Sequence, residues 1–375
     1  MTPGKKLAAL LTSTLVATFS FGQSLLTTVP IANYPQALAV NAFTNRIYVL
    51  EESANQVTEI DGLTNAAVTI PLGTNSESSL NGALAINPIT NTIYAVDGVN
   101  NHLSIIDGVT QAVTQITVGN APVALAVNPS TNTIYIANEV DNTVTVVNGK
   151  TLATTTVAVG TGPTAMAIDS SQNKVYVANF SSSTVTIIDA KSTSTVAVGE
   201  HPVAIAVNRN THTAYTVNRE ANSVSVITSG IVTGTVATGS VPVRLAINDL
   251  TDQIYVVNIS GGGVTVIDGK TNSTISVTAG AQPSSVAIDE LRNKVYVQNG
   301  NGPSLTVIDG KTNTSTTLGN ISSGADIVAV DVLTNHVYIS TAYPTGSTVA
   351  VFSGANGTFP ANLLDEMMGP VNGLN

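Results

Sequence analysis

Apolar and polar residues alternate along most of the chain, in short runs separated by turns. The stretch NKVYVANFSSSTVTIIDAKS, which begins at Asn173, alternates twice and breaks at a serine-rich patch. Closely similar stretches begin at Asp252 and Asn293. Alternation with a period of two predicts β-strands, and no copy of the repeated stretch shows the 3.6-residue period of a helix. We therefore expect an all-β protein built from one repeated unit.

Each copy of the unit carries one tyrosine, and the spacing of these residues indicates the architecture. The tyrosines are Tyr48, Tyr94, Tyr135, Tyr176, Tyr215, Tyr255, Tyr296 and Tyr338, at successive intervals of 46, 41, 41, 39, 40, 41 and 42 residues. A period near 40 with alternating apolarity is typical of β-propellers, in which each blade is a four-stranded antiparallel sheet. We expect a single propeller with eight blades; seven blades and an odd terminal unit is the alternative. A tyrosine present in every copy indicates packing between blades rather than catalysis.

One copy, residues 121–160, illustrates the order of strands expected in a blade. Its four strands, which we letter A to D, are VALAVN, TIYIAN, TVTVVN and TTTVAVG. Strands C and D meet at Asn148-Gly149, and other copies have Asp-Gly there. Because such dipeptides accept positive φ, we expect a tight hairpin at this junction.

The two ends of the repeat array supply parts of one blade. The eighth copy contains DIVAVD, HVYIS and STVAVFSG, and no clear fourth strand follows. The segment SLLTTVPIANYP, from Ser24, resembles strand D and the loop after it. We expect this N-terminal strand to complete the last blade and close the ring, which removes the exposed sheet edges of an open array.

The repeated phrase resembles the YVTN family of β-propeller repeats. The residues that carry this resemblance are VYVAN at 175–179, IYVVN at 254–258, and TVIDGKT at 265–271 and 306–312. The resemblance extends over nearly all of the chain after residue 22. It implies a propeller from the bacterial or archaeal cell surface or secretome, a group that includes surface-layer components. Propellers serve as binding proteins and as enzymes, so the resemblance implies no single activity.

The first 22 residues predict a secretory signal peptide. Lys5 and Lys6 precede an apolar run that ends at Phe21, and small residues stand before Gln23. The run is too short and too interrupted by Thr and Ser to favour a membrane anchor, and no later segment suits a membrane span. We expect a signal peptide at 1–22, a propeller at 23–360 and a tail at 361–375. The expected location is secreted, periplasmic or at the cell surface.

The amino-acid composition limits the kinds of partner that we expect the protein to bind. The 375 residues include no Cys and only 10% charged residues, with a formal net charge of −10 that becomes −12 without Lys5 and Lys6. No basic stripe is present to displace counterions from phosphates, which excludes a nucleic-acid partner. Disulfides are excluded as well, so stability must come from the core and from ring closure.

Because strand direction alternates, the D–A and B–C loops share one face of the ring (the DA/BC face), and the A–B turns and C–D loops share the other (the AB/CD face). The DA/BC face is irregular and acidic, with two cations, Arg219 and Arg244, against Glu51, Glu52, Glu77, Asp97, Glu139, Asp141, Glu200, Glu220 and Asp326. Variable loops on a regular scaffold are where binding residues gather. The candidate ligand-binding residues near the central channel are Glu51, Glu52, His102, Glu139, Phe180, Glu200, His201, Arg219, Arg244, Asp326 and Tyr343.

Several of these residues have two interpretations. Arg244 replaces a small residue of the other copies, and would either clamp an anionic ligand or pair with a rim acid. His102 and His201 belong to different parts of the ring, which argues against a shared metal. The acidic loops would suit Ca²⁺, but no calcium-binding motif is present, so the sequence identifies no cofactor.

Three functional hypotheses follow. The first is an exported, non-enzymatic propeller that binds a protein, a glycan or a cell-envelope polymer through its acidic loop face. The second is a lactonase-like hydrolase or lyase with a metal or polar cluster in the channel; no catalytic residue can be named for it, because the sequence has no Cys, HExxH or G-x-S-x-G motif. The third is a structural component of the cell surface or wall.

Overall fold

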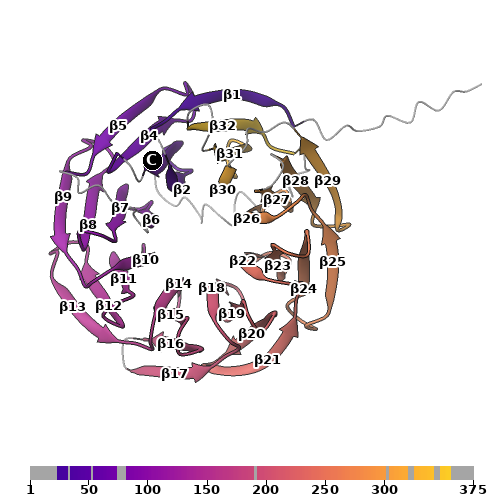
Figure 1. Ribbon diagram of the computed structural model, residues 1–375. Helices are drawn as coiled ribbons and strands as arrows, with labels where there is room; N and C mark the ends of the chain where they lie inside the picture. The colour runs from indigo at the N-terminus through magenta and orange to yellow at the C-terminus, as the bar shows by residue number, and fades with distance from the viewer. Residues whose placement is uncertain are drawn as a thin grey trace, which may run out of the picture.

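The computed structural model describes residues 23–32, 34–51, 54–73, 82–189, 192–300, 304–319, 325–341 and 347–355. The predicted signal peptide and C-terminal tail lie outside these residues. The described chain contains 32 strands arranged as eight four-stranded antiparallel sheets. Figure 1 shows the sheets as blades of one closed ring. The prediction of an all-β propeller with eight blades, rather than seven, is confirmed. Within this described part, no helix is long and apolar enough to cross a membrane.

The first four blades follow one another along the chain. Blade 1 is β2 (Pro35–Asn41), β3 (Arg46–Glu51), β4 (Gln56–Asp61) and β5 (Ala67–Pro71). Blade 2 is β6 (Leu84–Asn87), β7 (Thr92–Asp97), β8 (His102–Asp107) and β9 (Val113–Thr117). Blade 3 is β10 (Pro122–Asn128), β11 (Thr133–Asn138), β12 (Thr143–Asn148) and β13 (Thr154–Ala158). Blade 4 is β14 (Pro163–Asp169), β15 (Lys174–Asn179), β16 (Thr184–Ile188) and β17 (Thr193–Ala197).

The remaining blades continue the series and end with a blade of mixed origin. Blade 5 is β18 (Pro202–Asn208), β19 (Thr213–Asn218), β20 (Ser223–Thr228) and β21 (Ile231–Ala237). Blade 6 is β22 (Pro242–Asn248), β23 (Gln253–Asn258), β24 (Gly263–Asp268) and β25 (Thr274–Thr278). Blade 7 is β26 (Pro283–Asp289), β27 (Lys294–Asn299), β28 (Ser304–Asp309) and β29 (Thr314–Gly319). Blade 8 is β30 (Ala325–Asp331), β31 (His336–Thr341), β32 (Thr348–Ser353) and β1 (Leu25–Pro30).

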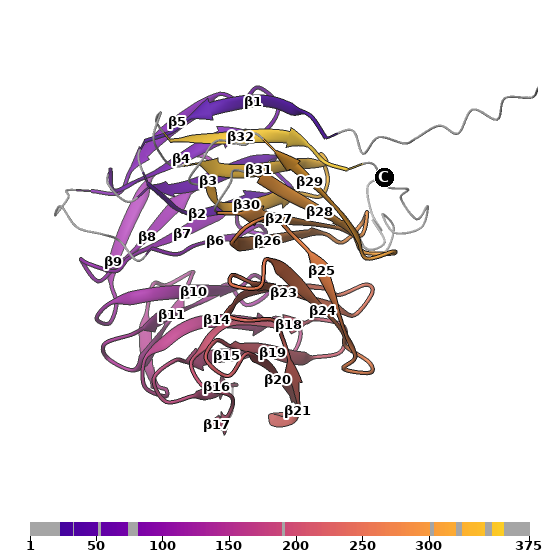
Figure 2. The same cartoon turned by 45° about the vertical axis from the view of Figure 1, so that its right-hand side comes forward.

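The N-terminal strand closes the ring, as the sequence predicts. β1 pairs antiparallel with β32, so that Thr28 lies opposite Ala350 and Val29 opposite Val349. Both views show β1 beside β32 (Figures 1 and 2), and Figure 1 shows β1 at the outer rim and the A strands nearest the axis of the ring. Every blade therefore has four strands, and blade 8 takes its outermost one from the opposite end of the chain.

The repeated tyrosines pack between blades. Tyr48 of blade 1 shares a core cluster with Ile93 and Ile106 of blade 2. Tyr338 of blade 8 shares a core cluster with Ile47 of blade 1, where the last blade meets the first. Removal from water disfavours the phenolate, and burial thereby raises the pKa values of Tyr215, Tyr255 and Tyr296 to about 12. The prediction that these tyrosines are packing residues is consistent with this arrangement.

Where Asp-Gly or Asn-Gly stands at the end of strand C, the C–D loop has four or five residues and differs from the predicted tight hairpin. In blade 5 the two residues Ser229 and Gly230, both at positive φ, do form such a hairpin. In blade 3 the loop occupies residues 149–153, and its positive φ (60°) is at Leu152 rather than at Gly149. The side chain of Asn148 shapes the loop by accepting two backbone amides within it, at 2.9 and 3.0 Å. Glycine is needed at 149 for another reason: a Cβ there would lie 2.6 Å from Oδ1 of Asn132, in the neighbouring A–B turn. The requirement is set by a tertiary contact, which local turn chemistry does not reveal.

Candidate functional site

A strained backbone position recurs on the DA/BC face, at the entrance to the inner strands. In six blades the residue immediately before the proline that begins strand A has a φ between 50° and 66°: Tyr34, Ala121, Gly162, His201, Val241 and Gln282. Positive φ is uncommon for residues other than glycine, and for a β-branched residue such as Val241 it is a clear outlier. One backbone conformation therefore presents a different side chain in each of these blades.

The B–C loop of the same blade holds this position in place. The carbonyl oxygen of His201 accepts the amide of Arg219 at 3.0 Å, and that of Gly162 accepts the amide of Phe180 at 2.8 Å. The same bond joins Val241 to Ile259 at 3.0 Å. Blades 4 to 6 thus each present a pair of variable side chains on the same hydrogen-bonded backbone arrangement.

Next to these hydrogen-bonded D–A and B–C loops lies the asparagine that ends strand B. Nδ2 of Asn138 donates to the hydroxyls of Thr143 and Thr145 at 3.0 and 2.9 Å. A Cβ added to Gly119, in the preceding D–A loop, would approach this asparagine to 2.6 Å. Asn179, Asn218, Asn258 and Asn299 are buried at the equivalent position in blades 4 to 7. The recurring Asn of the repeat is therefore a buried brace for the loops of this face.

Two of the predicted rim acids occupy this brace position instead of projecting into solvent. Glu51 ends strand B of blade 1 and is fully buried; its carboxylate accepts the amide of Ala32 at 2.8 Å and Nε2 of Gln56 at 2.7 Å. Desolvation by burial raises its pKa above the ordinary value. Asp97, at the same place in blade 2, is buried and accepts the amides of residues 99 and 100. Neither side chain is presented to a partner, so the exposed charge of this face is smaller than the sequence suggests.

The structure brings three of the predicted residues together where blades 4 and 5 meet. The rings of Phe180 and His201 are stacked, with centroids 4.3 Å apart and planes inclined by 10°. Arg219, bonded through its amide to the carbonyl of His201, is exposed beside them. Glu200 and Glu220, their immediate chain neighbours, are also exposed. This group combines an aromatic surface with both signs of charge.

Arg244 lies in the inner strand of the next blade. Its side chain is exposed, and its Nη1 donates to the carbonyl of Val243 at 3.2 Å. The surrounding protein nevertheless lowers its pKa through desolvation, as expected for a cation on a strand that faces the axis of the ring. Among the described residues no carboxylate forms an ion pair with it. The guanidinium is thus available to an anionic or hydroxyl-rich ligand.

The other predicted residues are not gathered at this place. His102 begins β8 in blade 2, and Glu139 lies half-buried in the B–C loop of blade 3. Asp326 belongs to β30, and Glu52 and Tyr343 lie outside the described residues. Over the part of the chain that the structure describes, no three His, Asp or Glu side chains are grouped closely enough to hold a metal ion.

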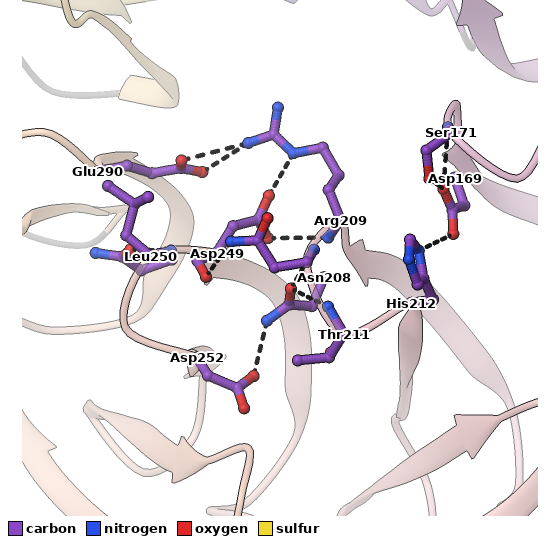
Figure 3. Close-up of polar contacts among 12 residues, drawn as sticks. Asp169, Ser171, Asn208, Arg209, Thr211, His212, Asp249, Leu250, Asp252 and Glu290 are labelled. Carbon is purple, nitrogen blue, oxygen red and sulfur yellow. Dashed lines mark hydrogen bonds and ion pairs between the residues drawn. The ribbon is translucent and has the colours of Figure 1, made fainter. Parts of the chain in front are cut away.

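A polar network that the sequence did not reveal lies on the AB/CD face (Figure 3). Arg209 of blade 5 bridges Asp249 of blade 6 and Glu290 of blade 7, with Nη2 3.0 Å from Glu290 Oε1. Nδ1 of His212 in blade 5 lies 2.7 Å from Oδ2 of the buried Asp169 in blade 4, and this contact joins the two blades. These contacts connect residues about forty or more positions apart, so no local motif signals them. We interpret them as ties between blades.

Comparisons with known proteins support the fold alone. No family model matches the chain, so the resemblance to YVTN repeats stays a prediction, and no curated protein matches it either. Among solved structures, the chain is similar to the hydrazine synthase of Kuenenia stuttgartiensis, with a TM-score of 0.58 and 17% sequence identity. The match covers 74% of this chain and 97% of the other. At this identity the two proteins share a fold, and neither ligand nor reaction can be transferred.

Proposed function

We propose that this protein is an exported, non-enzymatic β-propeller that binds a cell-envelope glycan through the DA/BC face of blades 4 to 6. The binding residues in this proposal are Phe180, His201, Arg219 and Arg244. Export is inferred from the signal-peptide pattern of residues 1–22. The repeat motifs further support placing the chain among the YVTN propellers.

The observation that carries the proposal is the stack of Phe180 on His201, which projects from a backbone position of positive φ where glycine is also accepted. A non-glycine residue at positive φ costs on the order of 1 kcal/mol or more. Gly162 occupies the same position in blade 4, so this backbone arrangement accepts glycine. Ala121 has the same conformation in blade 3, so the strain alone does not indicate binding, but the side chain of His201 is retained there and is stacked on a second aromatic ring.

The chemistry of the cluster suits a sugar. The half-exposed Phe180–His201 pair offers an aromatic surface for the apolar face of a pyranose ring. Arg219 and Glu200 beside it supply a donor and an acceptor for hydroxyl groups. Arg244, toward the axis, would contact an acidic or hydroxyl substituent farther along a polymer.

The test separates binding from stability. In His201→Gly the aromatic stack is lost, while the backbone strain is relieved and the flexibility of the unfolded chain increases, so the net stability should change by no more than about 1 kcal/mol. We expect binding to a glycan array and to isolated cell envelopes to fall at least tenfold. Leu152→Gly, at a φ of 60° in a C–D loop on the opposite face, is the matched control and should bind normally. Undiminished binding by His201→Gly, or an equal loss in Leu152→Gly, would refute the proposal.

A further inference from the structure

The AB/CD face carries a patch of exposed apolar side chains that the repeat does not require. They stand two residues beyond the end of strand A or strand C, in blades 8, 1 and 2. The five residues, which we name the apolar arc, are Leu333 (43% exposed), Phe43 (75%), Leu63 (83%), Ile89 (70%) and Val109 (81%). Single exposed apolar residues are ordinary, but a group on adjacent blades indicates a surface that another segment covers.

Equivalent positions in other blades are mostly polar. After strand A, blades 3 to 5 have Ser130, Ser171 and Asn210, and after strand C, blades 3, 6 and 7 have Lys150, Lys270 and Lys311. Blade 6 has the single exposed Leu250, whereas Leu291 of blade 7 is buried. Because the same turns form with serine or lysine, the apolar arc is a property of blades 8, 1 and 2 rather than of the fold.

Hydrogen bonds hold the loops of the arc side by side. The amide of Gly62, next to Leu63, donates to the carbonyl of Asn45 in the A–B turn of the same blade at 2.9 Å. Nδ2 of Asn41 donates to Oδ1 of Asn91 at 2.8 Å and joins the A–B turns of blades 1 and 2. Blade 8 adjoins blade 1 at the ring closure (Figure 1). The arc is therefore one surface that runs over three neighbouring blades.

The described chain ends on this same face. The amide of Gly354 donates to the carbonyl of Asn335 at 2.7 Å, the counterpart in blade 8 of the contact between Gly62 and Asn45. Ala355, the last described residue, is fully buried, and its amide donates to the hydroxyl of Tyr296 at 2.8 Å. Residues 356–375 thus start from a fixed point at the AB/CD end of blade 8.

The sequence of this segment, NGTFPANLLDEMMGPVNGLN, has an amphipathic pattern. Its large apolar residues Phe359, Leu363, Leu364, Met367 and Met368 recur with the spacing of one face of an α-helix. A helix this short is marginal in water and needs an apolar surface to pack on. Sheets pack about 10 Å apart, so the arc extends about 20 Å across its three blades. Eight residues beyond Ala355 reach up to about 27 Å, which is sufficient.

We propose that the C-terminal segment, residues 356–375, packs on the apolar arc of its own ring. A tether this short gives the segment an effective concentration on the order of millimolar at the arc, far above that of a second copy in a dilute solution. In this arrangement the segment covers the five apolar side chains of the arc. This site is separate from the glycan-binding surface proposed for the opposite face.

Hydrogen exchange of the full-length protein tests the proposal. We expect amides within residues 359–368 to exchange at least tenfold more slowly than their intrinsic rate. The double substitution Leu63→Asp and Val109→Asp should abolish this protection, because it places two charges in the arc. Both sites are exposed, so the ring should stay folded, which circular dichroism and thermal melting verify. Val140→Asp, at a valine that is 67% exposed on the opposite face, is the matched control and should leave the protection unchanged.

Two results would overturn the proposal. The first is exchange of residues 359–368 at the intrinsic rate in the unmodified protein, or protection that the arc substitutions leave intact. The second is a full-length dimer, measured by light scattering, that the arc substitutions dissociate without any effect on exchange in the segment. That result would assign the arc to a second copy of the chain.

Discussion

Substitution of Val29 tests whether the N-terminal strand truly closes the ring. Val29 is only 3% exposed, and its side chain belongs to the core cluster that blades 8 and 1 share with Tyr338 and Val349. β1 is attached to blade 8 through noncovalent contacts alone, since its chain continues into blade 1. The loss of stability on substitution of Val29 therefore reports how much the packing of β1 on blade 8 stabilises the closed ring.

The expected loss follows from the burial of this side chain. Val29→Ala removes two carbon groups, each worth about 0.8 kcal/mol on transfer from water, and the cavity that remains raises the total to about 2–3 kcal/mol. With an unfolding entropy of about 2.1 cal/mol/K per residue, a chain of this length has an unfolding entropy of about 0.8 kcal/mol/K. The melting temperature should then fall by about 3–4 °C.

Equilibrium unfolding in urea, followed by circular dichroism, gives the free energy of unfolding. Val277→Ala is the matched comparison: Val277 is 4% exposed in β25, whose blade is continuous in sequence. Thr28→Ala, at the exposed neighbouring residue, should change the stability by less than about 0.5 kcal/mol. If Val277→Ala is destabilising while Val29→Ala is not, β1 is not part of the cooperative core and the closure described above is wrong.

Two further predictions concern the AB/CD face. Gly62→Ala should lower the free energy of unfolding in urea by about 1–3 kcal/mol, because the new Cβ would lie 2.0 Å from Oδ1 of Asn45. Gly319→Ala is the control, since no atom lies within 4 Å of the new Cβ. Equal losses of stability in the two variants would contradict the steric argument. Loop amides, chiefly that of Thr64, lower the pKa of Asp61 from 3.8 to about 2. Its folded pKa is below its unfolded pKa, so its contribution to stability is present above pH 4 and is lost as the pH falls toward 2. Asp61→Asn should therefore flatten the stability profile between pH 4 and 2, and unchanged profiles would exclude this role.

Much of the fold could be predicted because its signals are local and repeated. Strands B and C of the copy at residues 121–160 lie at Thr133–Asn138 and Thr143–Asn148, as read from alternation. Alternation reports which side of a sheet is buried, and eight copies of the pattern identify the strands even where one copy departs from it. The closing strand was predictable for the same reason, since the segment from Ser24 has the pattern of strand D.

The candidate site was less predictable, because its determinants are contacts between distant residues. Charge alone placed Glu51 on the rim, although alignment with Asn138 puts it at the buried brace position. The bridge from Arg209 to Glu290 joins residues of blades 5 and 7, and sequence spacing gives no sign of it. The stack of Phe180 on His201 likewise depends on how two blades meet. Both residues were identified from the sequence, but their contact was not.

The pairing of β1 with β32 also sets an order of events during synthesis. Among the described strands of the ring, β1 leaves the ribosome first and its partner β32 last, so Leu25 finds Phe352 only after the other described strands have been made. Until then β1 has no sheet to join and blade 8 does not exist. A nascent or prematurely terminated chain is therefore an open array with unpaired sheet edges, which favour association with other chains until β1 pairs with β32.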